Sequence, residues 1–370
     1  MPGPVDWNRA EQVAISVAAR QPAGGRAQLH GVDFRDMARL AEDRVEANTG
    51  LRSMLGPAEV RILDRPDWIR ANIASMRTLI DPVLARWLDT AGRNDTDRRR
   101  RGLAGFGIPS FGMTGAVSAV SAQVAGAELG LVLGWMSARV LGQYDLLVGD
   151  AGDGDAVYLV GPNMTALEER FGFEPDQFRL WVTLHELTHR AQFTGVPWMR
   201  EHFLGLVHRT LDLADPDPAR IIGALREAVQ NRDAAGQRLR DGGLMAMVST
   251  PEQQAVFQRV AGLMSLLEGH GDVVMDRAGA DLIPSAERFA RVLQERRRRA
   301  NPMARFVQRL IGLEGKMNQY EAGERFISAI EAAEGERAVD RCWQHPDQLP
   351  TLDEVRDPQR WLARMEPAVA

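Results

Sequence analysis

Cysteine is nearly absent from this chain, since Cys342 is the only one among 370 residues. A single thiol cannot form a disulfide within the chain, and this fits a reducing compartment. The first residues carry acid before base and no apolar run, so we predict no signal peptide and a cytoplasmic protein. An apolar content of 45% is enough to fill a sizeable core without covalent links.

A strong excess of one charge is also lacking. The 45 basic residues nearly balance the 50 acidic ones, which leaves a net charge of −5. Such a chain has no global field to recruit nucleic acid, so we expect no nucleic-acid partner. Arginine runs at 98–101 and 296–299 follow acidic residues, and we interpret both as solvated segments.

Long purely apolar runs are missing as well. Residues 112–142 form a long helical stretch rich in small residues, but polar side chains such as Glu128 interrupt it. We therefore expect no membrane span. Gly126, Gly130 and Gly134 recur every four residues along one helix face, a pattern that permits close packing against another helix.

The periodicity of the chain is mostly helical, with few strand signals, and predicts a mainly α protein with a small β-sheet, an α+β fold. We expect one compact unit with three consecutive regions: a helical region over 1–102, a core over 103–280 and a helical region over 281–370. A polar break is expected at 92–102. The expected helices cover 34–47, 66–89, 112–142, 176–194, 250–279, 286–298, 302–311 and 319–334, and the expected strands cover 60–63, 144–148 and 156–160.

The most informative segment is His185-Glu186-Leu187-Thr188-His189, which lies in the expected helix 176–194. Helical spacing puts His185 and His189 on one face, where two neutral imidazoles can bind one Zn²⁺. In hydrolytic sites of this pattern the glutamate is the general base and not a ligand, which assigns that role to Glu186. The alternative is a core helix whose histidines are satisfied by carbonyl groups, with Glu186 in a salt bridge.

A tetrahedral catalytic site also needs a third protein ligand. The metzincin extension is excluded, because Gln192 and Gly195 stand where that pattern requires glycine and histidine. Farther along the chain, Glu268 and Asp272 share one face of the helix expected over 250–279. A carboxylate that accepts the second ring N–H of a ligand histidine fixes its tautomer, and Asp272 is a candidate for this task.

His270 competes with Glu268 for the place of third ligand. It lies about 200° around the helix from Glu268, off the face shared with Asp272, so we prefer Glu268. His202 is a weaker candidate. Tyr320, Arg325 and His270 are candidates for stabilising an oxyanion or contacting substrate, although each has a simpler interpretation as packing or as a surface group.

Several further motifs accompany this segment along most of the chain: Gly142-Gln143-Tyr144-Asp145, Val160-Gly161-Pro162-Asn163, Trp181, Val196-Pro197-Trp198, Glu268-Gly269-His270, and Gln319-Tyr320-Glu321 with Gly323-Glu324-Arg325-Phe326. Together they resemble the actinobacterial-type zincin-like metallopeptidase family, whose members carry labels such as hydrolase or coenzyme F420 biosynthesis-associated protein. The resemblance implies a zincin-like, largely helical fold, an intracellular setting and Zn²⁺ at His185 and His189. The Glu-x-x-x-Asp spacing resembles the gluzincin peptidases, which implies Glu268 as third ligand and Asp272 behind a ligand histidine.

We therefore predict a zinc-dependent hydrolase, in the first place a metallopeptidase, with Glu186 as general base. Its expected partner is a peptide or a small amide substrate, and the sequence gives no oligomeric state. Two alternatives stay open: a non-catalytic interaction protein on a zincin scaffold, and a zinc hydrolase of a small amide or ester.

Overall fold

The structure is a computed structural model that describes residues 5–22, 29, 34–100, 115–146, 155–213, 250–298 and 317–366. Helices dominate, and a three-stranded sheet accompanies them, which confirms the predicted α+β class. The chain divides into two compact units, each discontinuous in sequence. Unit 1 comprises Met1–Asp33 with Glu59–Pro175, and unit 2 comprises Phe34–Ala58 with Asp176–Ala370. These units group residues by spatial contact and not by their order in the sequence. They therefore do not test the three consecutive regions expected from the sequence, which stay a prediction.

Unit 1 contains the sheet, with β3 at its centre. Strand β3 pairs in parallel with β1 and antiparallel with β2, and all five of its residues are buried. The predicted strand 156–160 is present as β3, whereas β2 covers Gly142–Tyr144 and overlaps the strand predicted at 144–148 only at Tyr144; residues 147–154 lie outside the described residues. The elements of this unit are α1 (Trp7–Ala19), β1 (Glu59–Leu63), α3 (Arg65–Arg100), α4 (Gly115–Ser137), β2 (Gly142–Tyr144), β3 (Ala156–Val160) and α5 (Gly161–Phe171).

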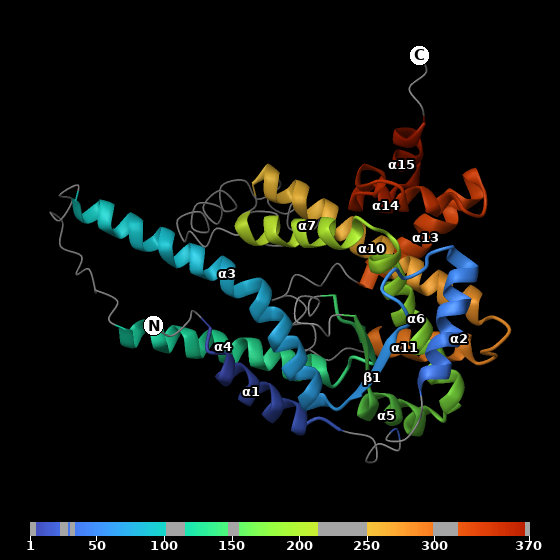
Figure 1. The fold of residues 1–370 in the computed structure, drawn as a ribbon, viewed down its shortest axis with the longest axis horizontal. Helices are drawn as coiled ribbons and strands as arrows, with labels where there is room; N and C mark the ends of the chain where they lie inside the picture. The colour runs from blue at the N-terminus through green and yellow to red at the C-terminus, as the bar shows by residue number, and fades with distance from the viewer. Residues whose placement is uncertain are drawn as a thin grey trace. The chain divides into compact units, whose positions relative to one another are not determined.

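Helices α1 and α4 lie side by side in Figure 1, and glycine allows their close approach. A Cβ atom added to Gly130 would lie 2.5 Å from the carbonyl oxygen of Ala10, and one added to Gly134 would lie 2.5 Å from that of Ala14. Both alanines are fully buried on α1. The glycine repeat therefore serves helix packing, as predicted. None of the helices in the described part of the chain is long and apolar enough to cross a membrane.

The polar break predicted at 92–102 is wrong for most of its length, because α3 continues to Arg100. A single Gly92 costs a helix only about 1 kcal/mol relative to alanine. The residues after it, up to Arg100, include no proline and four arginines, which favour helix, and Asp95 stands four residues before Arg99, a stabilising spacing. Charge alone thus did not end the helix. Residues 101–114 lie outside the described residues.

Unit 2 is helical and contains the His-Glu-x-x-His segment on α6. Its second long helix, α10, begins as predicted at Thr250, whose side chain and Gln253 form a reciprocal capping box. The predicted helix 302–311 lies outside the described residues. The elements of this unit are α2 (Phe34–Thr49), α6 (Pro175–Gly195), α7 (Met199–Leu213), α10 (Pro251–Gly279), α11 (Ala286–Arg298), α13 (Met317–Glu334), the 3₁₀ turns η3 (Ala338–Trp343) and η4 (Pro346–Gln348), α14 (Leu352–Arg356) and α15 (Pro358–Met365).

Helices α10 and α13 cross where both carry glycine. A Cβ atom on Gly269 would overlap the backbone of Gly323, and a Cβ atom on Gly323 would overlap the carbonyl oxygen of Ser265. Leu266 and Phe326, both fully buried, extend the same contact into the core of the unit. The crossing therefore fixes α10 closely against its neighbour at the level of Glu268.

Gly323→Ala is expected to destabilise the protein by about 1–3 kcal/mol, because the added methyl group must displace backbone atoms at this crossing. The free energy of unfolding in urea or guanidinium measures the effect. Gly205→Ala on α7 is the matched control, since in the described part of the chain nothing lies within 4 Å of its added Cβ. It should be neutral or stabilising by up to about 1 kcal/mol through helix propensity. Equal unfolding free energies for the two variants would contradict the packing argument.

Candidate metal centre

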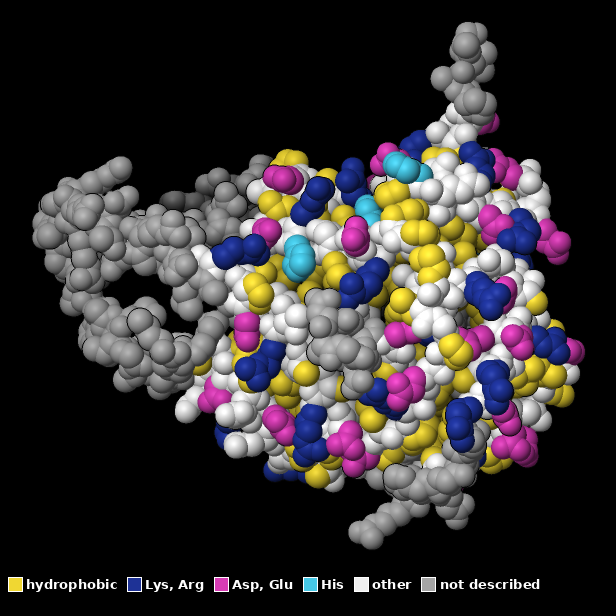
Figure 2. Space-filling model, viewed as in Figure 1, with side chains coloured by type: hydrophobic (Ala, Val, Ile, Leu, Met, Phe, Trp, Pro, Cys, Tyr) yellow, Lys and Arg dark blue, Asp and Glu magenta, His cyan; other side chains and the backbone are white. Residues whose placement is uncertain are grey.

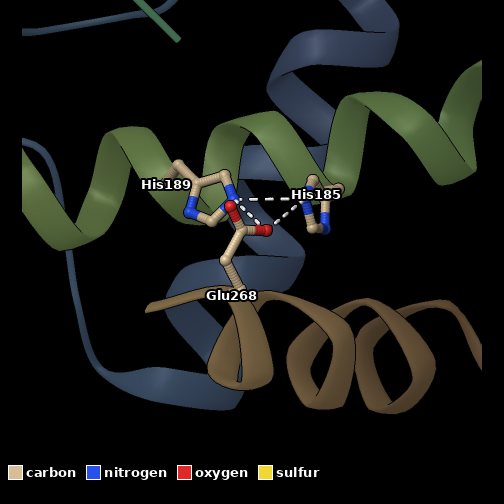
Figure 3. Close-up of side chains that lie close together, drawn as sticks. All are labelled: His185, His189 and Glu268. Atoms are coloured by element: carbon tan, nitrogen blue, oxygen red, sulfur yellow. Dashed lines mark hydrogen bonds and ion pairs between the residues drawn. The ribbon is translucent and has the colours of Figure 1, made fainter. Parts of the chain in front are cut away.

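Helix α6 presents two histidines one turn apart on the same face. The helix starts at Pro175, with Asp176 in its first turn, and ends at Gly195, in agreement with the predicted limits. Figure 3 shows His185 and His189 projecting from α6 towards Glu268, which comes from α10. Within the described residues these three side chains form a group able to hold a metal ion, with all donor atoms within 4.8 Å of one another.

The separations between the donor atoms match the size of a metal ion. The two Nε2 atoms lie 3.1 Å apart, and Glu268 Oε2 lies 3.7 Å from Nε2 of His185 and 3.8 Å from Nε2 of His189. Tetrahedral zinc with ligand bonds of about 2.0–2.1 Å has ligand atoms about 3.3 Å apart. The three observed distances lie on both sides of that value, so the donor set fits one ion.

Both histidines have their other ring nitrogen against an oxygen. Asp272 Oδ1 lies 3.6 Å from His185 Nδ1, within ion-pair range, and Gln192 Oε1 lies 2.9 Å from His189 Nδ1. When Nδ1–H faces an oxygen, the lone pair is left on Nε2, the atom that faces the shared centre. At 3.1 Å, the two Nε2 atoms can share either a proton, as a hydrogen bond between the rings, or a cation, when both lone pairs face inward. The arrangement is therefore suited to a metal ion.

One residue of this site was not predicted from the sequence. Gln192 was considered only as the residue that breaks the metzincin pattern. A polar residue three positions after His189, on the same face of a mostly apolar helix, was the signal that could have found it. Gly271 leaves room for the imidazoles, because a Cβ atom there would lie 3.2 Å from Cε1 of His185 and 3.3 Å from Cε1 of His189.

Burial and negative charge act in opposite directions on His189. Burial lowers its pKa, while the carboxylates of Glu268 and Glu186 raise it, and the net shift is upward from the usual value. The site thus has an excess of negative charge that favours a cation. Glu186 is 7% exposed and is not part of the three-residue donor group. His185 and Glu268 keep side-chain exposures of 21% and 22%, so solvent reaches the centre.

The other candidate residues lie elsewhere in unit 2. His270 is 3% exposed and packs edge-on against Trp343, with ring centroids 5.0 Å apart, and burial lowers its pKa to about 3. Its Nδ1 faces Gln192 and not the donor group. Arg325 is exposed on α13. Tyr320 belongs to the same helix, but its side chain lies outside the described residues. His202 is on α7 against Trp198.

Charge on the surface is mixed. Acidic and basic side chains are interspersed over the face shown in Figure 2, as the near balance of 45 basic and 50 acidic residues leads one to expect.

Comparison with known proteins gives a family and one solved relative. The profile of a family described as zincin-like metallopeptidase matches residues 5–362. A protein from Chloroflexus aurantiacus, whose crystal structure is described as that of a "putative hydrolase with a novel fold", is 30% identical, with a TM-score of 0.67. The alignment covers 98% of this chain and 99% of that one. No curated protein matches the chain.

Proposed function

The chain belongs to the zincin-like metallopeptidase family, and on that premise we propose that it is a zinc-dependent hydrolase whose substrate is a peptide. Membership supports a hydrolase and a metal in general terms, and the solved relative carries a hydrolase description. We assign His185, His189 and Glu268 as ligands, Glu186 as general base and Asp272 as the group that orients His185. The label coenzyme F420 biosynthesis-associated, which members of the resembling family carry, is not part of this proposal.

One observation carries this proposal: Nε2 of His185, Nε2 of His189 and Oε2 of Glu268 converge, beside a glutamate that is not one of the three. When bound, zinc would supply a Lewis acid and a water of lowered pKa. Three protein donors leave a fourth position of a tetrahedral site open, which is typical of catalytic and not of structural sites. A purely structural site would have no use for a neighbouring base.

The residues around the centre then have separate tasks. Glu186 takes a proton from the attacking water at a carboxylate oxygen and delivers it to the leaving amine nitrogen, the task of a general base that then acts as an acid. Gln192 holds the imidazole of His189 at its Nδ1, and Asp272, 3.6 Å from Nδ1 of His185, orients the other imidazole through its charge. The low exposure of Glu186 limits water around it and strengthens its electrostatic interaction with the reacting groups.

The test is metal content followed by an unbiased peptide-library digest. Purified protein from zinc-supplemented expression should hold about one zinc per chain and cleave peptides, and a chelator should abolish both. A parallel screen of small amides and esters separates the substrate classes. Turnover of small amides or esters alone would transfer the proposal to that class of substrate. A zinc-loaded protein that turns over nothing in either screen would leave the non-catalytic scaffold as the function.

Replacing the α10 side chains one at a time tests the assignment of the third ligand. Glu268→Ala should weaken zinc binding far more than His270→Ala, because only Glu268 directs an oxygen towards both imidazoles. Asp272→Ala should lie between them, with a loss of about 10–100-fold as for other groups that orient a ligand histidine. Zinc dissociation constants from chelator competition give the order. A larger loss in His270→Ala than in Glu268→Ala would reverse the assignment.

A further inference from the structure

The amide of Gln192 connects a proposed metal ligand with a buried histidine. Gln192 is fully buried on α6. Its Oε1 lies 2.9 Å from His189 Nδ1, and its Nε2 lies 3.1 Å from the carbonyl oxygen of Leu267 and 2.9 Å from Nδ1 of His270. The amide has one oxygen and two N–H groups to place, and three partners surround it.

The backbone carbonyl of Leu267 determines the orientation of the Gln192 side-chain amide. Exchanging the oxygen and nitrogen of a glutamine requires only a half-turn of the amide, so the hydrogen-bond partners determine the orientation. Two of the three partners are imidazole nitrogens, which can donate or accept. The third is a backbone carbonyl, which can only accept. Nε2 of Gln192 must therefore face Leu267, and Oε1 must face His189.

This orientation fixes the tautomer of His189. A neutral imidazole has one N–H, and Oε1 of Gln192 can only accept, so the proton belongs on Nδ1 of His189. The lone pair is then on Nε2, the atom that faces His185 and Glu268. With the opposite tautomer, a proton would stand where a metal ion has to bind.

We propose that Gln192 is a positioning residue, which transmits the fixed polarity of the Leu267 carbonyl to His189 and holds its Nε2 lone pair towards the metal centre. The value of this arrangement for metal binding rests on the proposed function, but the tautomer is a property of the metal-free chain. His270 completes the arrangement, since its Nδ1 accepts the second N–H of the amide, and its own proton is then on Nε2. His270 thereby serves the amide and not the metal.

The tautomer can be measured directly in the metal-free protein. The chain has seven histidines, so ¹⁵N-histidine labelling gives few signals, which single replacements can assign. At alkaline pH, where the imidazoles are neutral, long-range ¹H–¹⁵N correlations of the wild type should show the proton of His189 on Nδ1 and that of His270 on Nε2. Gln192→Met keeps the length of the side chain and removes its bonds. It should give His189 a mixture of tautomers and weaken zinc binding about 10–100-fold.

Two further variants separate positioning from general packing. Gln192→Glu restores an acceptor in front of His189, so it should restore the tautomer and much of the zinc affinity that Gln192→Met loses. It should cost stability, because its second oxygen faces the Leu267 carbonyl in place of an N–H. Thr188→Val is the matched control, because it removes a fully buried hydroxyl of α6 that bonds to the Leu184 carbonyl at 2.8 Å. It should leave both the tautomer and the zinc affinity unchanged, whatever its effect on the melting temperature.

The wild type alone can overturn the proposal, even if a variant fails to fold. A neutral His189 with its proton on Nε2 in the metal-free protein would do so, as would an unchanged tautomer and zinc affinity in Gln192→Met. If the wild type shows the expected tautomer but binds no zinc, the proposed function fails and the role of Gln192 in positioning His189 stands.

Discussion

Replacing His185 by alanine is expected to reduce the zinc content of the purified protein from about one ion per chain to a small fraction, because two remaining ligands do not hold the ion tightly. Hydrolysis should disappear with the metal. The loss should also be visible in stability, since a ligand present at about 1,000 times its dissociation constant stabilises the folded state by about 4 kcal/mol. Added zinc should therefore raise the melting temperature of the wild type and not that of the variant.

The matched control is His208→Ala, which removes an exposed imidazole from α7 in the same unit. It should keep the zinc content and the zinc-dependent rise in melting temperature of the wild type. Elemental analysis of the three proteins, together with melting curves with and without zinc, makes the comparison. Full zinc content in His185→Ala would refute the assigned ligand set, and so would the absence of zinc from the wild type.

Local sequence signals predicted the two helices that carry the site. The predicted helix 176–194 corresponds to α6, Pro175–Gly195, because proline and aspartate suit a first turn and Gly195 followed by Pro197 suits a last one. The start of α10 was predicted from the capping box at Thr250. These signals act within a few residues, so they can be recognised without knowledge of the tertiary structure.

Contacts between distant parts of the chain could not be predicted in the same way. That α10 lies against α6 follows from helix packing, and periodicity gives the buried face of a helix but not its partner. The approach of Glu268 to the histidines was expected from the helix face that it shares with Asp272 and from the resemblance to gluzincins, and not from any pattern that pairs the two helices. The bond from Gln192 to the Leu267 carbonyl depends on the relative shift of two helices along their axes, which no local pattern encodes.

The misjudged break at 92–102 has a related cause. Polar and arginine-rich sequence was interpreted as a loop, yet in α3 the charged residues extend a helix, since arginine has a high helix propensity. Composition distinguishes buried from exposed segments better than it distinguishes helix from loop. The two compact units show the same limit, because residues 34–58 join the later helices through contacts such as that of Glu42 with Arg190.

Glu186→Gln is expected to keep the fold and the bound zinc while lowering hydrolysis by about 10²–10⁴-fold, the usual contribution of a general base. The amide has nearly the same shape as the carboxylate but cannot take a proton from water. Glu186 lies outside the donor group of His185, His189 and Glu268, so its replacement should leave the zinc affinity close to that of the wild type. Retention of zinc together with loss of turnover is what distinguishes a base from a ligand.

The measurement compares wild type and Glu186→Gln at matched zinc content in the peptide-library digest. Glu201→Gln, which changes an exposed glutamate on α7, controls for the loss of one negative charge and should cleave like the wild type. Loss of zinc from Glu186→Gln would make Glu186 part of the metal shell. Equal cleavage by wild type and Glu186→Gln would mean that another group removes the proton from water or that a contaminating protease cleaves the peptides. Since a non-catalytic scaffold has no step that needs this proton transfer, a difference confined to Glu186→Gln is the result that only an enzyme can give.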